Sequence, residues 1–231
     1  MGRSLLFAIQ WAFWRAGYDV HKIRDPFADA SLHIATDAPT LFDVGANAGQ
    51  STLAMLARFP KANVHCFEPS PKTFKRLKQA VGERATLNQC AVGSEPGMMT
   101  LNENEISELT SLLPLGSDGY GKVERNVLVP VTTIDSYCAE NSIPEIDVLK
   151  IDAQGYDHQV LVGAERMLPK IRAIITELTF DDLYEGKTRY DLTMTLLADR
   201  GFKLVGVYNP NLGANDGLTS YADFLFAIVR K

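Results

Sequence analysis

Apolar and polar positions change period repeatedly along this chain. From residue 39 onward, short apolar runs typical of buried strands are followed by segments with an apolar residue at every third or fourth position, as in amphipathic helices. The first of these runs predict strands at 40–45 and 62–67 and helices at 50–58 and 71–81. A strand–helix–strand–helix order predicts a parallel sheet with helices on both faces.

The middle of the chain departs from that order. A third strand is predicted at 85–92, and because a glycine- and proline-containing turn follows it, a hairpin to a short strand at 98–101 replaces the crossover helix. Residues 102–126 are polar, contain three glycines and show no clear period, so we expect a lid or a binding loop there. The remaining pattern predicts strands at 127–133, 147–152 and 172–178, helices at 133–141, 156–168 and 190–200, and a closing hairpin of 202–207 with 223–229. Residues 39–231 therefore form one α/β domain of about seven strands.

Residues 1–38 form a separate N-terminal segment. Its apolar run, residues 5–14, predicts a helix with about half of the ~20 residues that a membrane span requires. No small-residue cleavage site follows the run, which argues against a signal peptide. Two interpretations stay open: the helix packs onto the body or onto a homodimer partner, or it lies in a membrane interface.

Composition narrows the class of protein. Apolar residues make up 46% and charged residues 22% of the 231 residues, which is enough for a sizeable core. The net charge of −5 argues against a protein that clamps nucleic-acid phosphates by bulk charge. Three widely spaced cysteines without a CxxC pair indicate reduced thiols, so we expect a cytoplasmic protein.

A glycine-containing turn follows the first predicted strand. Residues 42–51 read Phe-Asp-Val-Gly-Ala-Asn-Ala-Gly-Gln-Ser, which brings backbone N–H groups and a helix start toward a ligand. The G-x-G-x-x-G spacing of dinucleotide sites is absent. Asp43, two residues before Gly45, would repel a pyrophosphate but attract a ligand with an ammonium and a sulfonium group. S-adenosylmethionine carries both groups.

Further acids stand at predicted strand ends. Glu68 follows the second strand, 19 residues after Gly49, where an acid of a βαβ unit accepts hydrogen bonds from ribose hydroxyls. Asp152 and Glu177 end two later strands, and the carboxyl ends of parallel strands share one edge. Lys150, on the same side of its strand as Asp152, is either a site residue or the partner of a buried acid. The sequence therefore predicts an acidic ligand site.

The order of these motifs resembles the FkbM-type S-adenosylmethionine-dependent methyltransferases. The resemblance covers about residues 40–205 and is carried by 42–49, 67–69, 88–93, 110–112, 132–135 and 150–155, the last running on to 162–164. It implies a class I methyltransferase (Rossmann-like) fold with a seven-stranded sheet, and O-methylation of a hydroxyl on a sugar, glycolipid or natural product. The cofactor contacts that it implies are Asp43, Gly45, Asn47, Gly49, Gln50, Ser51, Glu68, Pro69, Asn88 and Asp152.

Candidate catalytic and acceptor-binding residues lie near the same predicted edge of the sheet. Thr110 and Ser111 are the expected substrate contacts, and Asp152, Glu177 and His158 are the candidate bases. Asp152 and Glu177 could instead hold Mg²⁺, but two carboxylates are few ligands for a protein-held ion, which favours a metal-free mechanism.

Three alternatives remain at this point. They are an S-adenosylmethionine-binding protein without catalysis, a nucleotide-sugar or dinucleotide enzyme, and a nucleic-acid methyltransferase. The acidic net charge and the lack of an Asn/Asp-Pro-Pro-aromatic tetrapeptide after residues 147–152 argue against the last.

Overall fold

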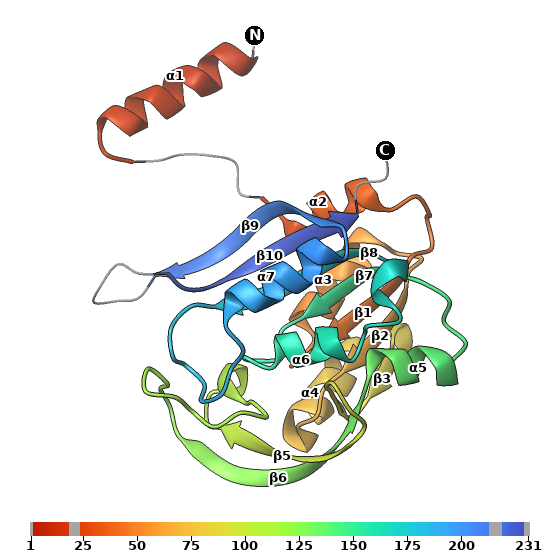
Figure 1. Ribbon diagram of the computed structural model, residues 1–231. Coiled ribbons are helices and arrows are strands. Elements are labelled where there is room, and N and C mark those ends of the chain that lie inside the picture. Colours follow the sequence, from red (N-terminus) through yellow and green to blue (C-terminus); the bar gives the residue numbers. More distant parts are fainter. Residues whose placement is uncertain (1, 19–23, 213–218, 229–231) are drawn as a thin grey trace.

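A mostly parallel sheet with helices on both faces forms the body of the protein (Figure 1). The computed structural model describes residues 2–18, 24–212 and 219–228. The sheet order is β3-β2-β1-β7-β8-β10-β9, in which β10 runs antiparallel to both neighbours and the other pairs are parallel. Its strands are β1 (Thr40–Val44), β2 (Asn63–Phe67), β3 (Thr86–Asn88), β7 (Ile146–Ile151), β8 (Ile171–Thr179), β9 (Phe202–Leu212) and β10 (Thr219–Ile228). The predicted seven-stranded α/β fold is confirmed.

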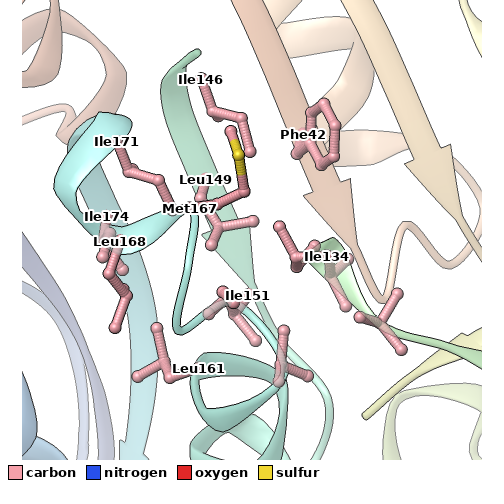
Figure 2. Packing of buried hydrophobic residues seen from close by; sticks show 14 of the residues in the cluster. Phe42, Ile134, Ile146, Leu149, Ile151, Leu161, Met167, Leu168, Ile171 and Ile174 are labelled. Carbon is pink, nitrogen blue, oxygen red and sulfur yellow. The ribbon is translucent and has the colours of Figure 1, made fainter. Parts of the chain in front are cut away.

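Two apolar layers cover the two faces of this sheet. Because successive strand residues point to opposite faces, Leu41 packs in one layer and Phe42 in the other. One layer includes residues of α2 (Pro26–Ala30), α3 (Gln50–Arg58) and α4 (Pro71–Val81). The other, part of which Figure 2 shows around Phe42 and Leu149, includes residues of α5 (Ile134–Glu140), α6 (Asp157–Val162) and α7 (Tyr190–Asp199). Short 3₁₀ turns complete the helical elements: η1 (Ser31–His33), η2 (Gly82–Arg84), η3 (Ser107–Leu109) and η4 (Leu168–Lys170).

Side-chain caps mark the starts of α4 and α5. The Ser70 hydroxyl accepts from the Thr73 N–H at the start of α4, and the Thr133 hydroxyl accepts from the Ser136 N–H at the start of α5. The predicted helix at 156–168 is wrong in its second half, because α6 ends at Val162. The Asp135 carboxylate accepts hydrogen bonds from the backbone N–H groups of residues 166 and 167, both at 2.9 Å. A continued helix would need these two backbone N–H groups for its own hydrogen bonds.

A second, smaller sheet is added to the fold. It consists of β4 (Ala91–Val92), β6 (Val123–Thr132) and β5 (Gly97–Asn104), in that order. The prediction of one strand at 85–92 is therefore wrong: the chain leaves the main sheet after Asn88, and its continuation pairs with β6. A strand at 98–101 is confirmed as part of the eight-residue β5, but the predicted hairpin is wrong, because β6 lies between β4 and β5.

The predicted loop at 102–126 is shorter than expected, since β5 and β6 extend into it. What remains is residues 105–122, here called the cover segment. It is tied to the chain after β8, because the Gly116 N–H donates to the Leu183 carbonyl at 2.8 Å and the Asp182 N–H donates to the Asp118 carboxylate at 2.9 Å. Leu115 and Tyr184 form an isolated antiparallel bridge beside these bonds. The cover segment is thus anchored at its middle as well as at its ends.

The predicted N-terminal helix is α1 (Gly2–Arg15). Its apolar side chains from Phe7 to Trp14 are largely exposed, so the structure does not show the expected packing against the body. Within the described ranges, no helix has the length and apolar character needed to cross a membrane.

Candidate functional site

A cavity of about 660 Å³ lies at the carboxyl ends of β1, β2 and β7. The predicted residues that line it are Gly45, Asn47, Glu68, Pro69, Thr110, Ser111 and Asp152. Thr110 and Ser111 come from the cover segment, which therefore forms one wall.

The glycine turn passes directly over the end of β7. Gly45 has φ +75°, and a Cβ atom there would lie 1.9 Å from the Asp152 carbonyl oxygen. The Gly45 and Ala46 N–H groups both donate to the Phe67 carbonyl at 3.0 Å, which joins the turn to the end of β2. Only glycine fits this position, because any side chain would collide with backbone and the positive φ is unfavourable for L-residues.

Glu68 lines the cavity with its carboxylate held in place. Its side chain is 6% exposed; Oε2 accepts from the Asn47 N–H at 3.0 Å and Oε1 accepts from the Ser70 N–H at 2.8 Å. Burial raises the pKa of Glu68 to about 7, although these two hydrogen bonds act in the opposite direction. Each oxygen keeps a further lone pair for a ligand hydroxyl.

Asp43 does not line the cavity, contrary to the prediction that it contacts the ligand. The side chain is fully buried, accepts from the Thr52 hydroxyl of α3 at 2.6 Å, and lies 3.7 Å from the Lys150 ammonium. Burial raises the pKa of Asp43, and the Lys150 charge opposes that shift. Asp43 therefore supports the turn from beneath, and Lys150 is paired with the buried Asp43 and with Asp152 at the cavity.

Asp152 is fixed by two neighbours. Lys150 Nζ donates to Oδ2 at 3.1 Å, and Gln154 Nε2 donates to Oδ1 at 2.5 Å. The Tyr184 hydroxyl donates to Gln154 Oε1 at 2.6 Å, and the Ser111 hydroxyl donates to the Gln154 carbonyl at 2.7 Å. Gln154 thus connects Asp152 with the cover segment and with the chain after β8.

Neither Gln154 nor Tyr184 was predicted as a site residue. Gln154 stands inside the motif at 150–155, which is a signal in the sequence. Tyr184 lies 30 residues further on, in a stretch without a motif, so no sequence signal identifies it.

A second cavity, of about 280 Å³, is lined in part by residues that follow those of the first cavity in the sequence. Gly155, Asp157, His158, Glu177 and Lys187 are among its lining residues, whereas residues 152–154 line the first cavity. Burial raises the pKa of Glu177 well above its ordinary value, and the nearby carboxylates, Asp152 first among them, add to the shift. Among the described residues, no hydrogen-bond donor reaches the Glu177 carboxylate.

The remaining candidates near the second cavity have structural partners. Nδ1 of His158 lies 3.1 Å from the Thr193 hydroxyl, and burial lowers the pKa of this histidine. Asp157 is buried and accepts from the Ala153 N–H at 3.3 Å and from the Thr176 hydroxyl at 3.2 Å. Asp157 is the first residue of α6, and its bond to Thr176 fastens that helix to β8.

Four further predicted contacts lie outside the first cavity. Gly49, with φ +97°, begins α3, and a Cβ atom there would lie 2.9 Å from Val81 Cγ2. Gln50 and Ser51 follow it without lining the cavity. Asn88 Nδ2 donates to the Cys66 carbonyl at 3.0 Å and to the Tyr137 hydroxyl at 3.2 Å. These residues shape the turn and the strand ends that surround the cavity.

The residues at the sheet edge do not fit a divalent cation. In the described part of the chain, no group of three or more His, Cys, Asp or Glu side chains is arranged to hold a metal ion. The Lys150 ammonium already pairs with Asp152 Oδ2, and its positive charge would repel a metal ion there.

Sequence comparison shows that the chain is similar to known methyltransferases. A family model described as the methyltransferase FkbM domain matches residues 43–204. The 2-O-methyltransferase NoeI of Sinorhizobium fredii is 25% identical over 205 residues, which cover 80% of this chain and 84% of that protein. The 31-O-demethyl-FK506 methyltransferase FkbM of Streptomyces tacrolimicus is 29% identical, with 74% of this chain and 75% of that protein covered.

A third relative and one solved structure extend the comparison. The hexuronic acid methyltransferase AglP of Haloferax volcanii is 31% identical over 151 residues, which cover 64% of this chain and 59% of that protein. The crystal structure of methyltransferase FkbM from Methylobacillus flagellatus superposes with a TM-score of 0.55 at 16% identity. The aligned part covers 87% of this chain but 48% of that one, so the agreement concerns the fold.

Proposed function

Because the chain belongs to the FkbM family of S-adenosylmethionine-dependent methyltransferases, we propose that it methylates a hydroxyl oxygen of a sugar, a glycolipid or a small natural product. Relatives named for a 2-O position, a 31-O position and a hexuronic acid support this acceptor class. The observation that carries the proposal is that Asp152, Ala153 and Gln154 line the first cavity while Gly155, Asp157 and His158 line the second, so the turn after β7 borders both.

The first cavity fits the cofactor. Glu68 would accept hydrogen bonds from the ribose hydroxyls, and the turn from Gly45 to Asn47 would lie against the cofactor. Asn47 Oδ1 is buried without a hydrogen-bond partner among the described residues, so an acceptor is available there for a ligand donor. When bound, S-adenosylmethionine supplies a methyl group on a positively charged sulfur.

Glu177 is the base that this arrangement favours. Asp152 already accepts from Lys150 and Gln154, which suits an orienting role, and burial weakens His158 as a base. Glu177 lines the second cavity, and its raised pKa makes it a stronger base than an ordinary carboxylate. The Glu177 carboxylate would accept the proton of the acceptor hydroxyl as that oxygen displaces the cofactor's sulfur from the methyl carbon. This proton path needs no metal ion.

The acceptor would lie in the second cavity and reach the methyl group between Glu177 and the cover segment. Thr110 and Ser111 of the cover segment line the first cavity. Holding the two reactants in line is itself a large part of the catalysis, on the order of 7–11 kcal/mol for well-oriented reactions.

The proposal is tested by a methyl-transfer assay with labelled S-adenosylmethionine and a set of sugar and natural-product acceptors. We expect Glu177→Gln to lower kcat by roughly 10²–10⁴-fold, the usual contribution of a general base. Its affinity for S-adenosylhomocysteine should equal that of the wild type. The matched control is Glu165→Gln, whose carboxylate pairs with Arg200 on the surface.

Two outcomes would contradict it. Full kcat of Glu177→Gln, with Glu165→Gln unchanged, would remove Glu177 as the base. A wild-type protein that binds S-adenosylhomocysteine but methylates no hydroxyl compound while methylating RNA would overturn the acceptor class.

A further inference from the structure

Helix α1 exposes a row of aromatic side chains. Phe7, Trp11 and Trp14 follow one another at helical spacings of four and three residues, so they share one face, and they are 70%, 52% and 71% exposed. Ile9 and Phe13 are also exposed, on the other side of the helix. An apolar surface of this kind normally marks a contact with another molecule.

The charge of this segment is opposite to that of the chain as a whole. Residues 1–23 contain Arg3, Arg15 and Lys22 but only one acid, Asp19, whereas the whole chain has a net charge of −5. The Arg15 guanidinium lies over the Trp11 ring, 5.0 Å from its centroid. A basic group is thus fixed beside the aromatic row.

The length of α1 limits what it can do in a bilayer. Fourteen residues correspond to about 21 Å of helix, whereas the hydrocarbon core is ~30 Å thick. A helix that is too short to span but carries aromatic and basic side chains is suited to the interface, where tryptophan rings lie among the headgroups.

We propose that α1 binds the surface of an anionic membrane, with Phe7, Trp11 and Trp14 inserted at the headgroup level and Arg15 beside the lipid phosphates. The basic charge of this segment and its two tryptophans, a residue type enriched at membrane interfaces, favour an anionic lipid surface. A second copy of the chain, whose body is acidic, is the competing occupant that the experiments below distinguish. The proposal concerns where the enzyme works and does not depend on which acceptor it methylates.

The two tryptophans of the chain, Trp11 and Trp14, both lie in α1, so tryptophan fluorescence reports on this helix alone. The full chain is mixed with vesicles of phosphatidylcholine and an equal amount of phosphatidylglycerol, or with vesicles of phosphatidylcholine alone. We expect a blue shift and quenching by brominated lipid with the anionic vesicles, and much weaker changes with the neutral ones.

Variants separate the apolar and the charged contributions in a vesicle sedimentation assay. Arg15→Gln should weaken binding to anionic vesicles about fivefold, the effect of one basic charge near such a surface. The matched control Arg189→Gln removes an exposed arginine of the body and should have no effect. Trp11→Ser/Trp14→Ser should abolish sedimentation, whereas Leu128→Ser, at an exposed position of β6, should not. An unchanged affinity for S-adenosylhomocysteine shows that each variant is folded.

Three results would overturn the proposal. One is the absence of any fluorescence change with anionic vesicles. Another is equal binding to neutral and anionic vesicles. The third is a dimer in solution that Trp11→Ser/Trp14→Ser converts to a monomer, because a second copy would then cover α1.

Discussion

Gly45→Ala tests the close contact on which the shape of the first cavity depends. The new Cβ would lie 1.9 Å from the Asp152 carbonyl oxygen and 2.8 Å from its carbon, so either the turn or the end of β7 must move. An L-residue at positive φ costs about 1–2 kcal/mol, and forcing an extra methyl group into packed surroundings costs about 1–3 kcal/mol more. Since Asp152 and Gly45 both line the cavity, any shift also changes the cofactor site.

Gly201→Ala is the matched control. Gly201 also has a positive φ, +85°, but nothing lies within 4 Å of a Cβ atom built there. This control measures the cost of the backbone conformation alone, and the difference between the two variants measures the collision. At ~3 °C per kcal/mol for a chain of this size, Gly45→Ala should melt about 3–9 °C below Gly201→Ala.

Thermal unfolding and calorimetric titration with S-adenosylhomocysteine measure the two effects. We expect Gly201→Ala to bind the ligand like the wild type and Gly45→Ala to bind it at least about tenfold more weakly, the equivalent of 1.4 kcal/mol. Equal melting temperatures for the two variants would refute the reasoning, because the contact between the turn and β7 would then be too loose to matter.

Three further variants test other parts of the site. Because the pKa of Glu68 is about 7 and its ionised form accepts from ribose hydroxyls, the wild type should bind S-adenosylhomocysteine more tightly as the pH rises through neutrality. Calorimetry of Glu68→Gln should show weaker binding of S-adenosylhomocysteine and no dependence of this affinity on pH. If the affinity of both proteins changes with pH to the same extent, Glu68 is not the group that titrates. Tyr184→Phe removes the hydroxyl that donates to Gln154. Steady-state kinetics should show a lower kcat and an unchanged KM for the cofactor. A KM that rises by the same factor as kcat falls would indicate a general distortion of the site. Asp43→Ala leaves the buried Lys150 with one partner fewer, and denaturant unfolding should show a loss of about 3–5 kcal/mol. A stable Asp43→Ala that fails only in cofactor binding would restore the direct contact that the sequence suggested.

The local pattern of apolar and polar residues was sufficient to predict the helices and strands and the edge of the sheet at which the site lies. The apolar periods predict α3 and α4 with their observed ends, and the alternation of strands and helices predicts the parallel sheet. Parallel strands bring their carboxyl ends to one edge, so acids that follow β2 and β7 meet there whatever the loops do. Glu68 and Asp152 were found in this way.

The tertiary structure decided which of those acids reach a cavity and which residues join them. Asp43 lies within β1, one residue before its end, and its face of the sheet is covered by α3, so Thr52 and Lys150 surround it. The split of 85–92 into β3 and β4 depends on a pairing with β6, a strand that begins 31 residues after the end of β4. The link from Gln154 to Tyr184 likewise joins distant parts of the chain. Hydrophobic period and turn chemistry are local and can be read along the sequence, whereas burial and hydrogen bonding depend on which distant segment arrives at a position, and that is fixed only when the whole chain packs.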